Sequence, residues 1–304
     1  MYWRSLIAVT LLLGMFCCSA EAQDTSARER AEQTMRQAQS EDQFYDQLRR
    51  GNVLSPEDNA PRLDNETRKR VKNFRKVDPD VARTYSAFLN NPGTGITKFY
   101  PDNGCRSAKV INASDQCHDA IPQTFAFSFR SKAYIDDDYS DIAFKSTGIV
   151  AGSFFSQGAV LSLGDVPIEG IDLENPAVKA LSEIPPDKDV GAARETAVRL
   201  KAGYAMGGTR VSSLAKSAAN TTYAVRVIAY KMGTFVRRFN ERSTSIEKKF
   251  LMLEQDSRAD IIAVFRIVDL KPDGSVTVIW KLLDRRAPPR LKFERYQDLA
   301  DIRP

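Results

Sequence analysis

The chain has 304 residues, of which 42% are hydrophobic and 9% aromatic, so it has an ordinary composition for a folded protein and enough length to bury a large core. Lysines and arginines number 44 against 39 aspartates and glutamates, and the resulting net charge of +5 is too small to indicate a nucleic-acid-binding protein. With His118 as its one histidine, the chain lacks support for a Ser-His-Asp triad or for a zinc site of histidine and free cysteine.

Residues 1–22 have the features of a secretory signal peptide. Arg4 gives a positive start, an apolar run follows at residues 6–18, and Ala20 and Ala22 form an Ala-x-Ala cleavage motif. The apolar run is shorter than the roughly 20 residues that a transmembrane helix needs. We therefore expect cleavage near Ala22 and an exported, soluble protein, secreted or periplasmic, without a transmembrane anchor.

Residues 23–91 are predicted to form a charged, helical N-terminal arm. Its first half contains few apolar residues, which is typical of a solvated helix or a partly disordered segment. Two short helices are expected after a proline-containing linker, at residues 66–77 and 78–90. In the second helix, Asp78 is placed to cap the amino end and Pro79 suits the first helical position.

The first of these helices carries a dense basic cluster, which we call the basic set: Arg68, Lys69, Arg70, Lys72, Arg75 and Lys76. Such a run of cations can bind an anionic surface or polymer through charge–charge contacts. For an exported chain, a partner of this kind is more fitting than nucleic acid. The alternative is a solvated helix face that binds no partner.

Cys105 and Cys117 are the two cysteines that remain after cleavage, and in an oxidising compartment two cysteines most simply form one disulfide. The segment between them is rich in turn-forming residues. His118 follows Cys117 directly, but adjacent side chains of an extended chain point to opposite faces, so this adjacency does not indicate a catalytic thiol–imidazole pair. Metal ligation and a free thiol are the alternatives.

Residues 92–304 are predicted to form one α+β globular domain. Phe125, Phe127 and Phe129 alternate with smaller or polar residues, so residues 124–130 are expected to be a half-buried strand. Three apolar strands separated by turns are expected to extend it as an antiparallel meander, at residues 141–146, 148–155 and 158–165.

Two helices are then expected, at residues 175–184 and 187–203, before strands return at residues 221–231, 260–270 and 275–283. The sequence Pro272-Asp273-Gly274 between the last two strands is typical of a hairpin connection. Antiparallel runs of strands with helices between the runs favour an α+β fold over a parallel doubly wound sheet. The predicted fold is therefore an antiparallel β-sheet meander with inserted helices, preceded by the N-terminal helical arm.

An acidic run supplies a candidate calcium site at Asp136, Asp138 and Asp141. Carboxylate oxygens are the ligands that calcium prefers. The run does not match an EF-hand loop, because the sixth position is Asp141 instead of glycine and the twelfth is Thr147 instead of glutamate. A solvated turn between strands is the alternative.

The Ser-x-x-Lys spacing occurs twice, at Ser213 and Lys216 and at Ser245 and Lys248, which is close to chance for a chain so rich in both residues. Neither a dinucleotide-binding nor a phosphate-loop motif occurs, and we expect no cofactor. The sequence therefore favours a non-catalytic binding or interaction module. The alternative is a secreted hydrolase that uses carboxylate or Ser/Lys chemistry.

Three Asn-x-Ser/Thr sequons occur, at Asn65, Asn112 and Asn220. They matter only in a eukaryotic secretory pathway, where the asparagine side chain is glycosylated and must therefore be exposed.

Overall fold

The structure is a computed structural model of the whole chain. The residues it describes are 64–102, 106–107, 110–111, 121, 124–206, 209–232, 249–250, 252–253, 256–292 and 302. These residues belong to one compact unit, which comprises Ser55–Phe235 and Phe239–Pro304. The predicted signal peptide and the predicted disulfide cysteines, Cys105 and Cys117, lie outside the described residues.

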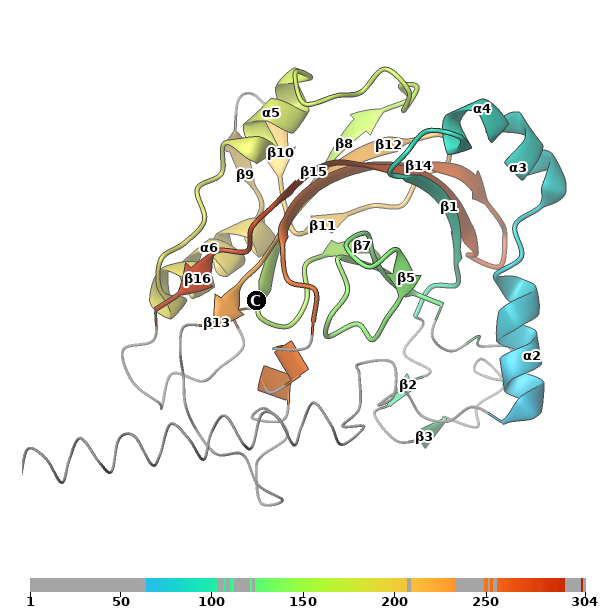
Figure 1. The fold of residues 1–304 in the computed structure, drawn as a ribbon, viewed down its shortest axis with the longest axis horizontal. Coiled ribbons are helices and arrows are strands. Elements are labelled where there is room, and N and C mark those ends of the chain that lie inside the picture. The colour runs from blue at the N-terminus through green and yellow to red at the C-terminus, as the bar shows by residue number, and fades with distance from the viewer. Residues whose placement is uncertain are drawn as a thin grey trace, which may run out of the picture. The chain divides into compact units, whose positions relative to one another are not determined.

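Two five-stranded antiparallel sheets dominate the fold, and helices are few, which is compatible with an α+β protein (Figure 1). The first sheet contains β1 (Thr94–Phe99), β8 (Ser156–Gly164), β12 (Thr222–Ala229), β14 (Asp260–Leu270) and β15 (Val276–Arg286). The second contains β4 (Ala126–Ser128), β5 (Ala133–Tyr134), β6 (Ile142–Lys145), β7 (Gly148–Ala151) and β11 (Leu214–Ala215). The strand order is β1-β15-β14-β12-β8 in the first sheet and β11-β7-β6-β4-β5 in the second.

The main hydrophobic core lies between the two sheets. From the first sheet, Val225, Phe265 and Trp280 pack into it, and from the second, Phe127 and Phe144, all at most 4% exposed. The register places Phe265 opposite Trp280 on neighbouring strands, and the ring of Phe127 lies 5.7 Å from that of Trp280. Each fully buried side chain of this size contributes roughly 1.5–3 kcal/mol, so this core is the main source of stability.

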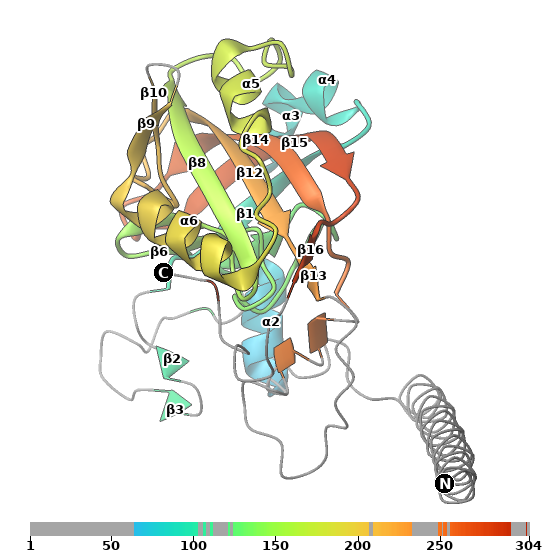
Figure 2. The same ribbon diagram turned by 90° about the vertical axis from the view of Figure 1, so that its left-hand side faces the viewer.

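Helices cover the opposite face of the first sheet. They are α4 (Ser86–Leu89), α5 (Pro176–Ser182) and α6 (Val190–Ala202), and Figure 2 shows α6 crossing β8. Phe88, Leu181 and Leu200 from these helices pack against Val264 and Ile279 of the sheet. Alternate residues of a strand point to opposite faces of the sheet. Helices cover one face of β12 and the second sheet covers the other, so all residues of β12 are buried.

Local sequence signals determine where the helices begin. α2 (Asn65–Phe74) starts after Asp64, whose carboxylate accepts a hydrogen bond from the Thr67 amide, and α3 (Pro79–Thr84) starts after Asp78 as predicted. The single helix expected at residues 78–90 is interrupted at Tyr85, which separates α3 from α4. In the described residues, no helix combines the length and the apolar character that a membrane span requires.

Short strand pairs complete the described elements. They are β2 (Arg106–Ser107) with β3 (Val110–Ile111), β9 (Tyr204–Met206) with β10 (Thr209–Val211), and β13 (Lys231–Met232) with β16 (Arg290–Leu291). The predicted hairpin between β14 and β15 is confirmed, because the two strands pair antiparallel. Gly274 adopts a φ of 81° in its turn, a conformation that glycine reaches without steric cost.

The half-buried strand predicted at residues 124–130 is wrong in both length and burial. β4 has only three residues, and every residue of the segment is buried on both faces. On one face, the small Ala126 packs with Phe125 and Ala143 in a separate apolar cluster. At the end of the segment, the charge of Arg130 is neutralised by carboxylates inside the protein. The charged side chain is therefore buried, although its place in the alternating pattern predicted a solvent-facing position.

The predicted meander is only partly correct. β6 and β7 pair antiparallel, but the chain then leaves the second sheet and β8 pairs with β12 of the first sheet. The change of sheet depends on a close backbone approach, because a Cβ atom on Gly158 would lie 2.1 Å from the carbonyl carbon of Ala151. Gly152, with a φ of 83°, begins the turn between β7 and β8.

Candidate functional site

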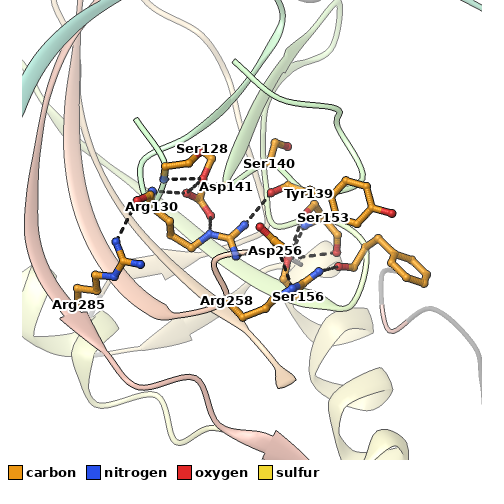
Figure 3. A network of polar contacts seen from close by, with 12 residues as sticks. Ser128, Arg130, Tyr139, Ser140, Asp141, Ser153, Ser156, Asp256, Arg258 and Arg285 are labelled. Atoms are coloured by element: carbon orange, nitrogen blue, oxygen red, sulfur yellow. Dashed lines mark hydrogen bonds and ion pairs between the residues drawn. The ribbon is translucent and has the colours of Figure 1, made fainter. Parts of the chain in front are cut away.

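Two arginines and two aspartates form a buried ion cluster, shown in Figure 3. We call it the ion cluster: Arg130, Asp141, Asp256 and Arg258. Arg130 follows β4, Asp141 precedes β6, and the other two precede β14. All four side chains are 5% exposed or less, so opposite charges inside the protein balance each other.

Asp256 joins the two arginines of the ion cluster. Its Oδ2 lies 3.2 Å from Nη1 of Arg130 and 2.9 Å from Nε of Arg258, while Nε of Arg130 lies 2.6 Å from Oδ1 of Asp141. The second oxygen of Asp141 accepts hydrogen bonds from the Ser128 hydroxyl and the Arg130 amide, both at 3.1 Å. Each charge therefore has a partner of the opposite sign, as buried charges require.

Arg258 of the ion cluster also fixes the turn between β7 and β8. Arg258 donates hydrogen bonds to the carbonyl oxygens of Phe154 and Phe155, at 3.0 and 2.9 Å. Phe155 is fully buried and has a φ of 55°, which a bulky residue rarely adopts. The contact with Arg258 therefore holds the backbone in a conformation that the local sequence does not favour.

The two arginines of the ion cluster stay protonated at neutral pH. Burial lowers the pKa of Arg258 to about 10, although Asp256 opposes the shift. Burial also acts to lower the pKa of Arg130, but the carboxylates of Asp141 and Asp256 outweigh burial and raise it above its usual value. Burial raises the pKa of the Asp141 carboxyl group, although the neighbouring Arg130 opposes this shift. Neither arginine loses its proton near neutral pH, and each charged group is held by a buried partner, so the ion cluster is suited to a structural role.

A pocket of about 220 Å³ lies between β7, β8, α6 and β11. Its apolar side chains come from β7, α6 and β11 and include Val150, Ala197, Leu200 and Leu214. The glycine that begins the β7–β8 turn, Gly152, also lines it and donates its amide hydrogen to the carbonyl of Asp141. The turn that the ion cluster fixes therefore forms one wall of the pocket.

Most polar groups of the pocket lining are engaged inside the protein. The amide nitrogen of Gln157 donates to Asp187 and to the carbonyl of Ala193, at 2.6 and 2.7 Å, while its oxygen accepts from the Tyr230 hydroxyl. The hydroxyl of Ser156 bonds within the β7–β8 turn.

Two polar groups of the lining remain available. The Ser213 hydroxyl and the Lys201 ammonium make no hydrogen bond or ion pair with any other described residue. They are therefore the polar side-chain groups of the lining that no other described residue engages.

The predicted calcium ligands are not brought together as one set. Carboxylate oxygens of Asp136, Asp137 and Asp138 lie within 4.8 Å of one another, whereas Asp141 is buried in the ion cluster. Asp138 also forms an ion pair with Lys249 at 2.6 Å. Calcium binding by Asp136 and Asp138 stays a prediction, and the third carboxylate near them is that of Asp137 instead of Asp141.

The basic set lies on α2 and in the residues that follow it. Five of its members are exposed: Arg68, Lys69, Arg70, Lys72 and Lys76. Arg75 differs, because it is half-buried and its guanidinium group lies 4.0 Å from the ring centre of Tyr134. Burial lowers the pKa of Arg75. The contact joins α2 to β5, so Arg75 has a structural role that the sequence pattern did not reveal.

The remaining predicted residues fall in different places. Ser213 lines the pocket, while Lys216, its partner in the Ser-x-x-Lys spacing, is exposed and does not line it. Asn65 and Asn220 are exposed, as glycosylation requires. The other candidates, Cys105, Asn112, Cys117, Ser245 and Lys248, lie outside the described residues.

The Tyr134 hydroxyl is bonded to the edge strand β1, and its ionisation should lower the stability of the protein at alkaline pH. Its hydroxyl donates to the Lys98 carbonyl at 2.6 Å and accepts from the Lys98 amide at 3.2 Å, and burial raises its pKa to about 12. An unfolded tyrosine ionises near pH 10, so between about pH 10 and 12 the unfolded state loses a proton that the folded state keeps. Stability is therefore lost as pH rises, by roughly 1.4 kcal/mol per pH unit from this group.

Urea unfolding at pH 10 and at pH 11 tests this prediction. Other tyrosines with raised pKa values add to the slope, so the comparison is between the wild type and Tyr134→Phe. The wild type should lose about 1 kcal/mol more than the variant over this interval. Equal losses would show that Tyr134 ionises normally in the folded protein.

Comparison with known proteins gives no match to the chain, whether with protein-family models, with curated proteins or with solved structures.

Proposed function

We propose that the chain is an exported, non-catalytic binding module. Residues 1–22 are removed as a signal peptide, and the charged arm that begins at residue 23 leads into the compact unit, which includes α2, α3 and α4 and carries the ligand-binding pocket. The leader sequence supports export, through its positive start, its short apolar run and its Ala-x-Ala motif.

The observation that carries the proposal is how the interior ionisable groups are used. An enzyme that performs acid–base chemistry gathers groups with perturbed pKa values in one cleft. Here the ion cluster pairs such groups with each other, and Arg226 and Asp260 form a second buried pair at 2.7 Å. Of the described residues that line the pocket, Lys201 is the one ionisable group. This arrangement supports binding over catalysis.

The basic set supports an anionic surface or polymer as a partner of the arm. Replacing Lys69, Lys72 and Lys76 by alanine should lower the salt concentration at which the protein elutes from an anionic resin. The matched control removes three exposed lysines elsewhere, Lys179, Lys188 and Lys231, and so has the same net charge. Equal elution of the two variants would show that net charge alone, and not the basic set, governs retention.

A second candidate function is a serine hydrolase, which the place of Ser213 in the pocket favours. A serine nucleophile needs a base that takes its proton, and Lys201 lines the same pocket. The two functions differ in the reactivity of this hydroxyl.

Treatment of the mature protein with a fluorophosphonate probe separates the two functions. We expect no covalent label in the wild type, as measured by intact mass. Label that is lost in Ser213→Ala but kept in Ser162→Ala, a matched change at an exposed serine, would overturn the non-catalytic proposal.

A further inference from the structure

We propose that the pocket between β7, β8, α6 and β11 binds a short aliphatic carboxylate. The hydrocarbon tail lies among Val150, Leu200 and Leu214, and the carboxylate meets Lys201 and Ser213. This inference rests on the proposed function as a binding module and names the chemical class of its ligand.

The size of the pocket limits the ligand. At about 220 Å³ it is smaller than the roughly 300–1,000 Å³ typical of sites for drug-sized molecules. A pocket of this size suits a ligand with few non-hydrogen atoms. Pentanoate, with five carbons and two oxygens, is a ligand of this size.

The lining favours a hydrocarbon chain over a polar molecule. Ala151, Ala197 and Leu200 give the pocket an apolar wall, and Gln157, its largest neutral polar residue, has its amide groups bonded inside the protein. Leu214, which lines the pocket, is 45% exposed, although leucine side chains are most often buried. A bound aliphatic tail would cover apolar surface on Leu214 and so contribute to affinity.

The polar groups favour a negative charge at one end of the ligand. Lys201 supplies a cation and Ser213 a hydroxyl donor, and none of the described residues that line the pocket is acidic. The carboxylate of Asp187, which accepts a hydrogen bond from Gln157 of the lining, is also bonded to the Thr196 hydroxyl. An anion would therefore gain an ion pair without facing a carboxylate in the pocket lining.

The pocket is also rigid, which lowers the cost of binding. The Ser213 backbone is bonded on both sides, because its carbonyl accepts from Ala151 and its amide donates to Leu200, each at 2.9 Å. Close packing at Gly158 and the ion cluster fix the opposite wall. A preformed site loses little conformational entropy when a ligand enters.

Calorimetric titration of the mature protein with three probes tests the inference. Pentanoate has tail and charge, pentan-1-ol has the tail alone, and acetate has the charge alone. We expect saturable binding of pentanoate, weaker binding of pentan-1-ol, and none of acetate. Absence of saturable pentanoate binding, or equal affinity for pentanoate and acetate, would overturn the inference.

Two variants locate the binding. Lys201→Gln should weaken pentanoate about fivefold, as expected for one partly exposed ion pair, and should leave pentan-1-ol unchanged. Lys179→Gln, at an exposed lysine of α5 that does not line the pocket, should change neither. Equal effects of the two lysine changes would place the anion elsewhere and refute the site.

The titration and the labelling experiment together distinguish failure of this inference from failure of the proposed function. Failure to bind pentanoate together with no fluorophosphonate label refutes this ligand class and leaves the binding module standing. Label on Ser213 refutes the non-catalytic function, whatever the result of the titration.

Discussion

Replacing Asp141 by asparagine is expected to lower the free energy of unfolding by about 3–5 kcal/mol. Asp141 is fully buried and its Oδ1 lies 2.6 Å from Nε of Arg130. Asparagine has almost the same shape, so the change removes charge without creating a cavity. Two buried arginines, Arg130 and Arg258, would then share the single carboxylate of Asp256. An uncompensated charge in the interior is the reason for the large effect.

Urea denaturation followed by tryptophan fluorescence measures this loss, since Trp280 lies in the core between the sheets. Asp137→Asn is the matched control. Asp137 is 34% exposed and lies 3.6 Å from Lys145, so its ion pair should contribute at most about 1 kcal/mol. If the two variants lost similar stability, the ion cluster would not be the buried, paired arrangement described above.

Replacing Arg226 by methionine should be about as damaging, with a loss of roughly 3–5 kcal/mol. Two nitrogens of Arg226 pair with the two carboxylate oxygens of Asp260, at 2.9 and 2.7 Å. Its third nitrogen donates to the carbonyls of Leu181, Ser182 and Ile184 at the end of α5. Methionine would leave a buried carboxylate and three carbonyl groups without this donor, which is costly in an apolar interior.

The loss should be greatest where α5 meets the first sheet. Relative to the wild type, the Arg226→Met variant should therefore show a larger acceleration of hydrogen exchange in α5 than in β14 and β15. The control is Arg83→Met, because Arg83 is 76% exposed and pairs with Asp80, which is 83% exposed, so this pair should contribute about 1 kcal/mol or less. Uniform acceleration of exchange across the sheet would contradict a role for Arg226 in anchoring α5.

The ion cluster also bears on the pocket, since both depend on the turn between β7 and β8. Arg258 holds the carbonyls of Phe154 and Phe155, and Gly152 of the same turn lines the pocket. A binding pocket needs walls that keep their shape when it is empty. The buried charges thus stabilise the turn between β7 and β8 and, with it, one wall of the pocket.

Several features followed from the sequence alone, because they depend on neighbours along the chain. The start of α3 after Asp78 rests on a capping side chain and a proline, and both act within one helical turn. The hairpin at Gly274 likewise depends on a single turn with a positive φ.

Only the tertiary structure decided which strands pair and which charges meet. β8 looked like the next strand of a meander, yet it joins the other sheet, since pairing is determined by which edge the folded chain brings near it. Arg130 looked solvent-facing and Asp141 looked like a calcium ligand, yet they neutralise each other and Asp256, which lies 126 residues from Arg130 along the chain. Periodicity reports the two faces of one element, whereas an ion pair or a pocket depends on distances between segments far apart in sequence.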